Sequence, residues 1–145
     1  MATNVFKKLF VDAGAWIAIA NKKDRQHQAA RVFYYTLPQF VELYTSYLVI
    51  SEAFTWQRYH LGSHVAFKFI DSIEKASISQ LLKIIFPDAL IDAKTRQYLH
   101  RYKDHNLSYS DAASFAICDM LKINDIFGFD KDFYIVKKSL WPPTT

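Results

Sequence analysis

Short runs of β-branched and aromatic residues alternate along this chain with longer segments of helical apolar spacing, and this alternation constrains the fold most. The runs typical of strands are residues 8–12, 40–45, 78–86, 123–128 and 134–141. The segments typical of helices are residues 13–20, 24–35, 47–59, 63–75, 87–102 and 110–121. Helices between strands supply the crossovers that parallel strands need. The order therefore predicts an α/β fold with a mostly parallel sheet and helices on both faces.

Several boundaries carry their own signals, and one segment is ambiguous. Ser46 is a candidate N-cap for the helix that follows it, Gly62 separates two helices, and Pro87 sits at a helix start. Residues 78–86 fit either a strand or a helix. Their Ile and Leu content beside a proline favours the strand.

The composition is that of a globular protein with one core. Of 145 residues, 51% are hydrophobic, and 3 glycines and 4 prolines are too few for low-complexity linkers. With no internal repeat, we expect a single domain over residues 1–145. The lone Cys118 can form neither an internal disulfide nor a cysteine-rich zinc site, which favours a reducing compartment. A net charge of +4 permits a polyanionic partner without establishing one.

The N-terminus has some features of a secretory signal. Lys7 and Lys8 precede an apolar run that closes at Ala20 with an A-x-A-like ending. Asp12 interrupts that run, and an ionised carboxylate is costly in an apolar segment. No uncharged apolar run reaches the ~18 residues that a membrane-spanning helix needs. We therefore expect a cytoplasmic protein with no membrane partner.

Three carboxylates are isolated in stretches that otherwise resemble core. Asp12, Glu52 and Asp111 are each the only formal charge in a long segment, with His105 taken as neutral. An unpaired, partly buried carboxylate is costly, and no Lys or Arg lies in these segments to serve as a partner. Several acids with this shared need point to a cation. A ligand set of oxygens without His or Cys suits Mg²⁺ or Mn²⁺ rather than Zn²⁺.

Simpler structural roles explain some of these acids when each is taken alone. Backbone N–H groups of the following helix can satisfy Asp12, and Ser108-x-x-Asp111 matches a capping box. Asp130 lies beside other charged residues, as in a solvated loop. Glu52, in mid-helix, has no such explanation. Together the acids favour a metal site at the carboxyl ends of the strands, where Asp12 and Asp130 are expected.

Four blocks of the sequence, in matching order and spacing, resemble the conserved motifs of the PIN domain family. They are Phe10-Val11-Asp12, Ser51-Glu52-Ala53, Leu-Ser-Tyr-Ser-Asp-Ala-Ala-Ser-Phe-Ala at 107–116, and Phe-Gly-Phe-Asp-Lys-Asp-Phe at 127–133. The last two blocks are the most specific. The resemblance covers almost the whole chain, and its compact length is similar to that of stand-alone VapC-type toxins.

The resemblance implies a three-layer α/β/α sandwich and a metal-dependent endoribonuclease that hydrolyses RNA phosphodiester bonds. It assigns both catalysis and metal binding to four acids, which would hold one or two Mg²⁺ or Mn²⁺ ions. These acids are Asp12, Glu52, Asp111 and Asp130. Asp132 is then peripheral, because the family's acid in the last block is the first of the two. The resemblance also implies a homodimer held inactive by a cognate antitoxin.

The chain departs from the family pattern at two hydroxyl positions. Residues 13–15 supply no Ser or Thr after Asp12, and Gly128 stands where a Thr or Ser commonly precedes the last acid. Ser110 is the surviving hydroxyl candidate. Such hydroxyls help to position metal or water, so the departures leave the rate and the number of metal ions open.

Two other functions remain as alternatives. A non-catalytic or weakly active PIN-like module that binds RNA or protein is favoured slightly by the missing hydroxyls and disfavoured by the intact acids. A phosphoacceptor receiver domain would need an acid pair after the first strand and a central strand Asp, which are lacking.

An acidic pocket needs nearby cations to hold RNA phosphates. Nothing in the sequence ranks the candidates, which are Arg25, Arg31, Arg58, Lys68, Arg101, Lys103, Lys122 and Lys131.

Overall fold

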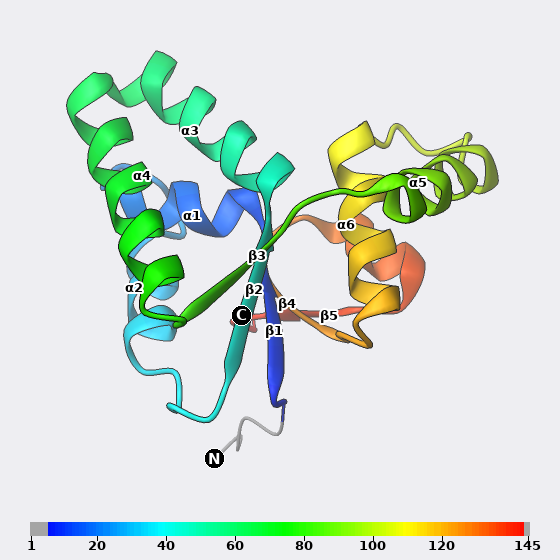
Figure 1. Ribbon diagram of the computed structural model, residues 1–145. Coiled ribbons are helices and arrows are strands. Elements are labelled where there is room, and N and C mark those ends of the chain that lie inside the picture. Colours follow the sequence, from blue (N-terminus) through cyan, green and yellow to red (C-terminus); the bar gives the residue numbers. More distant parts are fainter. Residues whose placement is uncertain (1–5, 144–145) are drawn as a thin grey trace.

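A five-stranded parallel sheet forms the middle layer of the molecule (Figure 1). The computed structural model describes residues 6–143. The strands are β1 (Lys8–Val11), β2 (Glu42–Ser46), β3 (Leu82–Ile85), β4 (Asp125–Phe127) and β5 (Ser139–Trp141). Their order across the sheet is β3-β2-β1-β4-β5, and every neighbouring pair is parallel. The predicted parallel α/β fold is confirmed.

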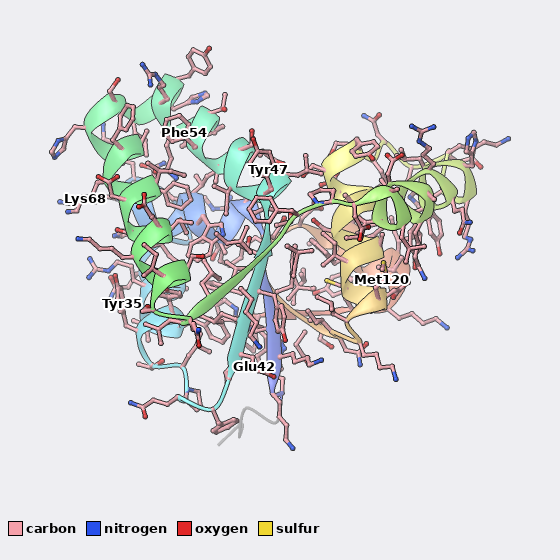
Figure 2. All side chains as sticks on the ribbon, viewed as in Figure 1. Tyr35, Glu42, Tyr47, Phe54, Lys68 and Met120 are labelled. Atoms are coloured by element: carbon pink, nitrogen blue, oxygen red, sulfur yellow. The ribbon has the colours of Figure 1, made fainter. Side chains whose placement is uncertain are left out.

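Helices cover both faces of this sheet, as the α/β/α prediction requires. They are α1 (Ala13–Ala20), α2 (His27–Tyr35), α3 (Tyr47–Leu61), α4 (Ser63–Ile78), α5 (Ala89–Arg101), α6 (Tyr109–Met120) and the 3₁₀ helix η1 (Lys131–Val136). Figure 1 shows α1 to α4 on one face and α5 and α6 on the other. In Figure 2, Phe54 and Lys68 mark the first layer and Met120 the second.

The core is centred on β1, which lies between β2 and β4. Leu9, Phe10 and Val11 are completely buried, as expected for a central parallel strand covered on both faces. On the second layer, Phe115 of α6 packs edge-on against Phe133 of η1, with ring centroids 5.3 Å apart. The apolar runs of the sequence therefore serve mainly this two-sided core.

The chain reverses its direction across the sheet between β1 and β4. It runs outward from β1 through β2 to β3, then crosses the opposite face to β4 and continues to β5. In open α/β sheets, ligands bind beyond the carboxyl ends of the strands at such a switch point. The topology therefore directs attention to the loops that follow β1 and β4.

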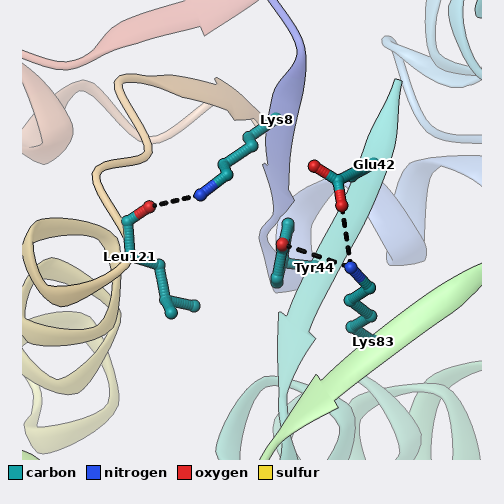
Figure 3. Close-up of polar contacts among 5 residues, drawn as sticks. All are labelled: Lys8, Glu42, Tyr44, Lys83 and Leu121. Atoms are coloured by element: carbon teal, nitrogen blue, oxygen red, sulfur yellow. Dashed lines mark hydrogen bonds and ion pairs between the residues drawn. The ribbon is translucent and has the colours of Figure 1, made fainter. Parts of the chain in front are cut away.

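Polar contacts tie together the opposite end of the sheet (Figure 3). Lys83 Nζ donates to Glu42 Oε1 at 2.8 Å, and Lys8 Nζ donates to the carbonyl of Leu121 at 3.0 Å. Figure 2 places Glu42 at this end and Tyr47 at the other, where α3 begins. The capping of α3 is as predicted, since Val49 N donates to Ser46 Oγ at 3.1 Å.

The ambiguous segment 78–86 proves to be a helix end, a turn and a short strand. Helix α4 continues to Ile78, and β3 begins only at Leu82. Gln80 lies between them with a φ of 64°, which neither a strand nor an α-helix can continue through. Ile78 and Leu81 are mostly exposed. Their apolar character therefore does not signal a buried strand.

The predicted strand over residues 134–141 is wrong for its first part. Residues Lys131–Val136 form η1, and the left-handed Lys137, with a φ of 60°, separates it from β5. Tyr134, at the start of the predicted strand, is instead an exposed residue of η1.

Two helix starts also differ from the prediction. Helix α5 begins after an N-cap at Asp88, whose carboxylate accepts from Ile91 N at 2.9 Å, so Pro87 lies one residue before the cap. Helix α2 begins at His27 rather than at Asp24. Asp24 instead accepts from Gln26 N at 2.8 Å within a turn. Over the described residues 6–143, no helix is both long and apolar enough to cross a membrane.

Candidate metal centre

Asp12 lies at the switch point of the sheet, between the end of β1 and the start of α1. Its backbone N–H donates to the carbonyl of Phe127 at 2.9 Å, which extends the pairing of β1 with β4 by one residue. The residue occupies the N-cap position of α1, but its side chain makes no capping hydrogen bond. The expectation that the helix N-terminus satisfies Asp12 is thus met only in part.

A buried polar chain fixes the backbone just before Asp12. Thr45 Oγ1 of β2 donates to the carbonyl of Val11 at 2.8 Å and accepts from Trp16 Nε1 at 3.3 Å. One hydroxyl therefore joins β1, β2 and α1 at the point where the acid emerges.

The pKa of Asp12 is raised from 3.8 to about 7 in the metal-free protein. Burial of the carboxyl group is the main cause, although part of the residue reaches solvent. The backbone N–H of Ala13 opposes the rise, and the charges of the other three predicted acids add to it. Asp12 is therefore close enough to Glu52, Asp111 and Asp130 for their charges to act on its carboxyl group.

Glu52 approaches the same site from the middle of α3. Its pKa is also raised, first by burial and then by the charge of Asp111. The Ser110 hydroxyl forms a hydrogen bond with its carboxylate and partly offsets this rise. Ser110 therefore lies where the sequence suggested a supporting hydroxyl, at the start of α6.

Asp111 has a structural role as well as a place in the cluster. Ser108 Oγ accepts from Asp111 N at 3.0 Å, and Asp111 Oδ2 accepts from Ser108 N at 3.1 Å. The predicted capping box is confirmed. Because the box holds the Asp111 carboxylate at the N-terminus of α6, the same contacts that cap the helix also orient this acid.

Asp130 and Asp132 bring two further carboxylates to the site from the start of η1. Asp130 Oδ1 accepts from Asp132 N at 2.9 Å. One carboxylate oxygen from each of Asp111, Asp130 and Asp132 can be chosen so that all lie within 4.8 Å of one another. Asp132 therefore lies in one acidic cluster with Asp111 and Asp130. The 3₁₀ turn, which the strand prediction missed, brings the two acids together.

None of these acids is paired with a basic side chain in the part of the chain that the structure describes. The ion pairs there are Lys83–Glu42, Arg96–Asp92 and Lys138–Asp119. Clustered carboxylates without such partners repel one another unless a proton or a cation neutralises them. The donors are all oxygens, which fits Mg²⁺ or Mn²⁺.

Gly128 provides room for Asp12. From the sequence, this position was interpreted only as a missing hydroxyl, and this role was not predicted. A Cβ atom at residue 128 would lie 3.1 Å from Asp12 Cβ and 3.7 Å from Asp12 Oδ2. Residue 128, where the family commonly has a hydroxyl, is thus a position at which the backbone lies close to the Asp12 side chain. A glycine directly after a buried strand was the available signal, since such glycines often mark close contacts.

The PIN domain family profile matches residues 9–139 of this chain. The 23S rRNA-specific endonuclease VapC20 of Mycobacterium tuberculosis is 26% identical over 125 residues, which cover 86% of this chain and 91% of that protein. The crystal structure of VapC20, titled a Sarcin-Ricin loop cleaving toxin, has a TM-score of 0.78 and covers 88% of this chain and 94% of its own.

A more distant solved structure shares the fold. FitAcB from Neisseria gonorrhoeae has a TM-score of 0.66 at 14% identity, with 92% of this chain and 96% of that chain covered. The family match includes every acid of the site and covers three of the five strands, β2, β3 and β4, in full. This chain is a homologue of an endonuclease and belongs to the PIN domain family.

Proposed function

We propose that this chain is a metal-dependent endoribonuclease that hydrolyses RNA phosphodiester bonds. The observation that carries the proposal is the convergence of carboxylates from α1, α3, α6 and η1 at the switch point of the sheet, without a basic partner among the described residues. Residues 1–145 are proposed to act as one domain.

The cluster of Asp111, Asp130 and Asp132 would hold a divalent ion, Mg²⁺ or Mn²⁺, with Asp12 and Glu52 beside it. When bound, such an ion acidifies a water molecule and offsets negative charge on the cleaved phosphate. The number of ions, one or two, is set by whether Asp12 and Glu52 bind directly.

The chain's own groups orient this chemistry. The capping box holds Asp111, the N–H of Asp132 holds Asp130, and the Ser110 hydroxyl acts on the pKa of Glu52. Asp12 is about half protonated at neutral pH while no cation is present, since its pKa is about 7. Cation binding would favour its ionised form, which then adds a further negative charge to the site.

The cellular role that fits these features is the toxin of a toxin–antitoxin pair. VapC20 is named a 23S rRNA-specific endonuclease and a toxin, so 23S rRNA is the first substrate to test here. We further propose a cytoplasmic homodimer that binds a cognate antitoxin. Light scattering would measure the dimer, and co-purification with the product of an adjacent open reading frame would identify the antitoxin.

Cleavage of 23S rRNA with Mn²⁺ or Mg²⁺, with and without a chelator, tests the enzymatic proposal. Asp111→Asn and Asp130→Asn should each reduce cleavage by about 100-fold or more, because each removes a ligand charge. Asp104→Asn is a matched control, since Asp104 is an exposed acid in the turn after α5. Full activity in either site variant would contradict the proposed roles. RNA binding without any cleavage would favour the binding-module alternative.

A further inference from the structure

A groove with a volume of about 490 Å³ lies beside the acidic cluster. Its walls come from the turn before α2, the segment from Gly128 to η1, and the residues that follow β5. The volume is in the range of pockets that hold small molecules. None of the residues that line this groove belongs to the proposed metal centre.

The groove and the acidic cluster share a boundary. Gly128 lines the groove, and it is also the residue whose Cβ would lie 3.1 Å from Asp12 Cβ. Lys131, another lining residue, lies between Asp130 and Asp132 in the first turn of η1. A ligand in the groove would therefore lie next to the carboxylates.

The lining combines cations with aromatic rings. Arg25 and Lys131 are exposed, and neither is ion-paired in the described part of the chain. Tyr134 is 55% exposed although it lies in a short helix beside the core, and Phe129 is half-buried. Cations hold phosphates, and exposed rings stack on bases, so this combination suits a nucleotide.

Another depression of similar size in the described residues also combines cations with an exposed ring, Lys68, Lys75 and Phe67. Its volume is about 500 Å³, and one face of α4, from Ser63 to Lys75, lines it. Unlike the groove, it has no lining residue next to an acid of the metal centre in the chain. The cation-and-ring combination beside the carboxylates is therefore the stronger candidate for substrate binding.

We propose that this groove binds the nucleotide next to the cleaved phosphate of a single-stranded RNA segment. Arg25 and Lys131 would hold its phosphate, and Tyr134 would stack on its base. The inference rests on the proposed ribonuclease function and extends it, since it selects two of the eight candidate cations that the sequence could not rank. It also explains how an acidic centre can hold a polyanion, because positive charge adjoins it.

Nucleotide binding can be measured without cleavage. Nucleoside 5′-monophosphates would be titrated into the ¹⁵N-labelled full chain in a chelator, with inorganic phosphate as a separate titrant. We expect saturable changes in the NMR chemical shifts of the backbone amides of Arg25, Lys131 and Tyr134. These changes should be larger with the nucleotides than with phosphate. Shifts that are absent, or confined to residues outside the groove, would overturn the proposal whatever the cleavage assay shows.

Cleavage kinetics supply the second test. Arg25→Ala, Lys131→Ala and Tyr134→Ala should each raise KM by about tenfold, whereas Tyr134→Phe, which keeps the ring, should raise it less than Tyr134→Ala does. Lys23→Ala and Tyr59→Ala are matched controls, because both residues are exposed and neither lines the groove.

The two failures are distinguishable. If wild type cleaves RNA and all groove variants match their controls, the subsite is refuted and the ribonuclease function stands. If wild type cleaves no RNA but nucleotides shift the groove amides, the ribonuclease proposal fails and nucleotide binding in the groove is supported.

Discussion

At the scale of single residues, burial and neighbouring charges make the ionisation of Asp12 unfavourable in the metal-free protein. Its pKa of about 7 means that the metal-free folded protein binds a proton that the unfolded chain releases near pH 3.8. Between these values the folded state binds more protons than the unfolded state. The free energy of unfolding therefore falls as pH rises through this window, by about 4 kcal/mol at most.

Asp12→Asn should remove this pH dependence, because the amide resembles the protonated acid in shape and charge. Without metal, the variant should be more stable than wild type at about pH 8 and similar to it at about pH 4. Urea unfolding in a chelator at both pH values measures the difference, with Asp104→Asn as the control. Equal stability of wild type and variant across the range would show that Asp12 ionises normally.

Gly128→Ala should disturb Asp12 by steric contact. The added Cβ would lie 3.1 Å from Asp12 Cβ, so we expect a loss of about 1 kcal/mol in stability and about tenfold in cleavage rate. Gly14→Ala offers a contrast, since nothing lies within 4 Å of its added Cβ and alanine favours the helix. That variant should gain up to about 1 kcal/mol. Thermal unfolding and cleavage rates of both variants should be measured together. A loss in Gly128→Ala alone indicates crowding at Asp12, whereas a loss in both variants indicates a general effect of losing a glycine.

At the scale of secondary-structure elements, helix N-termini deliver the acids. Asp12 precedes α1, Asp111 lies in the first turn of α6, and Asp130 precedes η1. The positive end of a helix dipole stabilises a nearby carboxylate, which offsets part of the mutual repulsion. Glu52, in the middle of α3, lacks this help and has the Ser110 hydroxyl instead.

Ser108→Ala tests whether the capping box also serves the metal centre. Loss of the cap should cost about 1 kcal/mol of stability, and Asp88→Ala, at the N-cap of α5, should cost about the same. Only Ser108→Ala should raise the Mn²⁺ concentration needed for half-maximal cleavage, because only it loosens a ligand. The same Mn²⁺ requirement in both variants would mean that capping and metal binding are independent.

At the scale of the whole molecule, a cation should link α1, α3, α6 and η1, which belong to opposite layers of the sandwich. A ligand that binds the folded state alone stabilises it by mass action, about 2.7 kcal/mol at a concentration 100 times Kd. The metal-free fold is correspondingly the less stable form.

Thermal unfolding with increasing Mn²⁺ or Mg²⁺ should show this stabilisation. Wild type should gain several degrees in Tm, whereas Asp111→Asn and Asp130→Asn should gain less, because a ligand charge is lost. Potassium chloride at matched ionic strength controls for screening of the clustered charges. A wild-type Tm that does not respond to either cation would argue against a metal site.

Local patterns in the sequence were sufficient to predict the parallel α/β fold, the capping of α3 and α6, and the isolation of three acids in apolar stretches. Hydrophobic periodicity and capping depend on near neighbours, so the sequence alone reveals them. Residues 78–86 and 134–141 were misread in part because Ile78, Leu81 and Tyr134 are apolar or aromatic but exposed, which only their surroundings reveal.

The assembly of the site depended on contacts between residues far apart in the chain. Sequence spacing is enough to show which acids lack a local partner. Contacts between distant segments place Asp132 beside Asp111, make Gly128 the residue that leaves space for Asp12, and bring a groove with cations near the carboxylates. The physical reason is that desolvation and charge–charge coupling depend on distances between segments, which the folding of the sheet sets and sequence spacing does not.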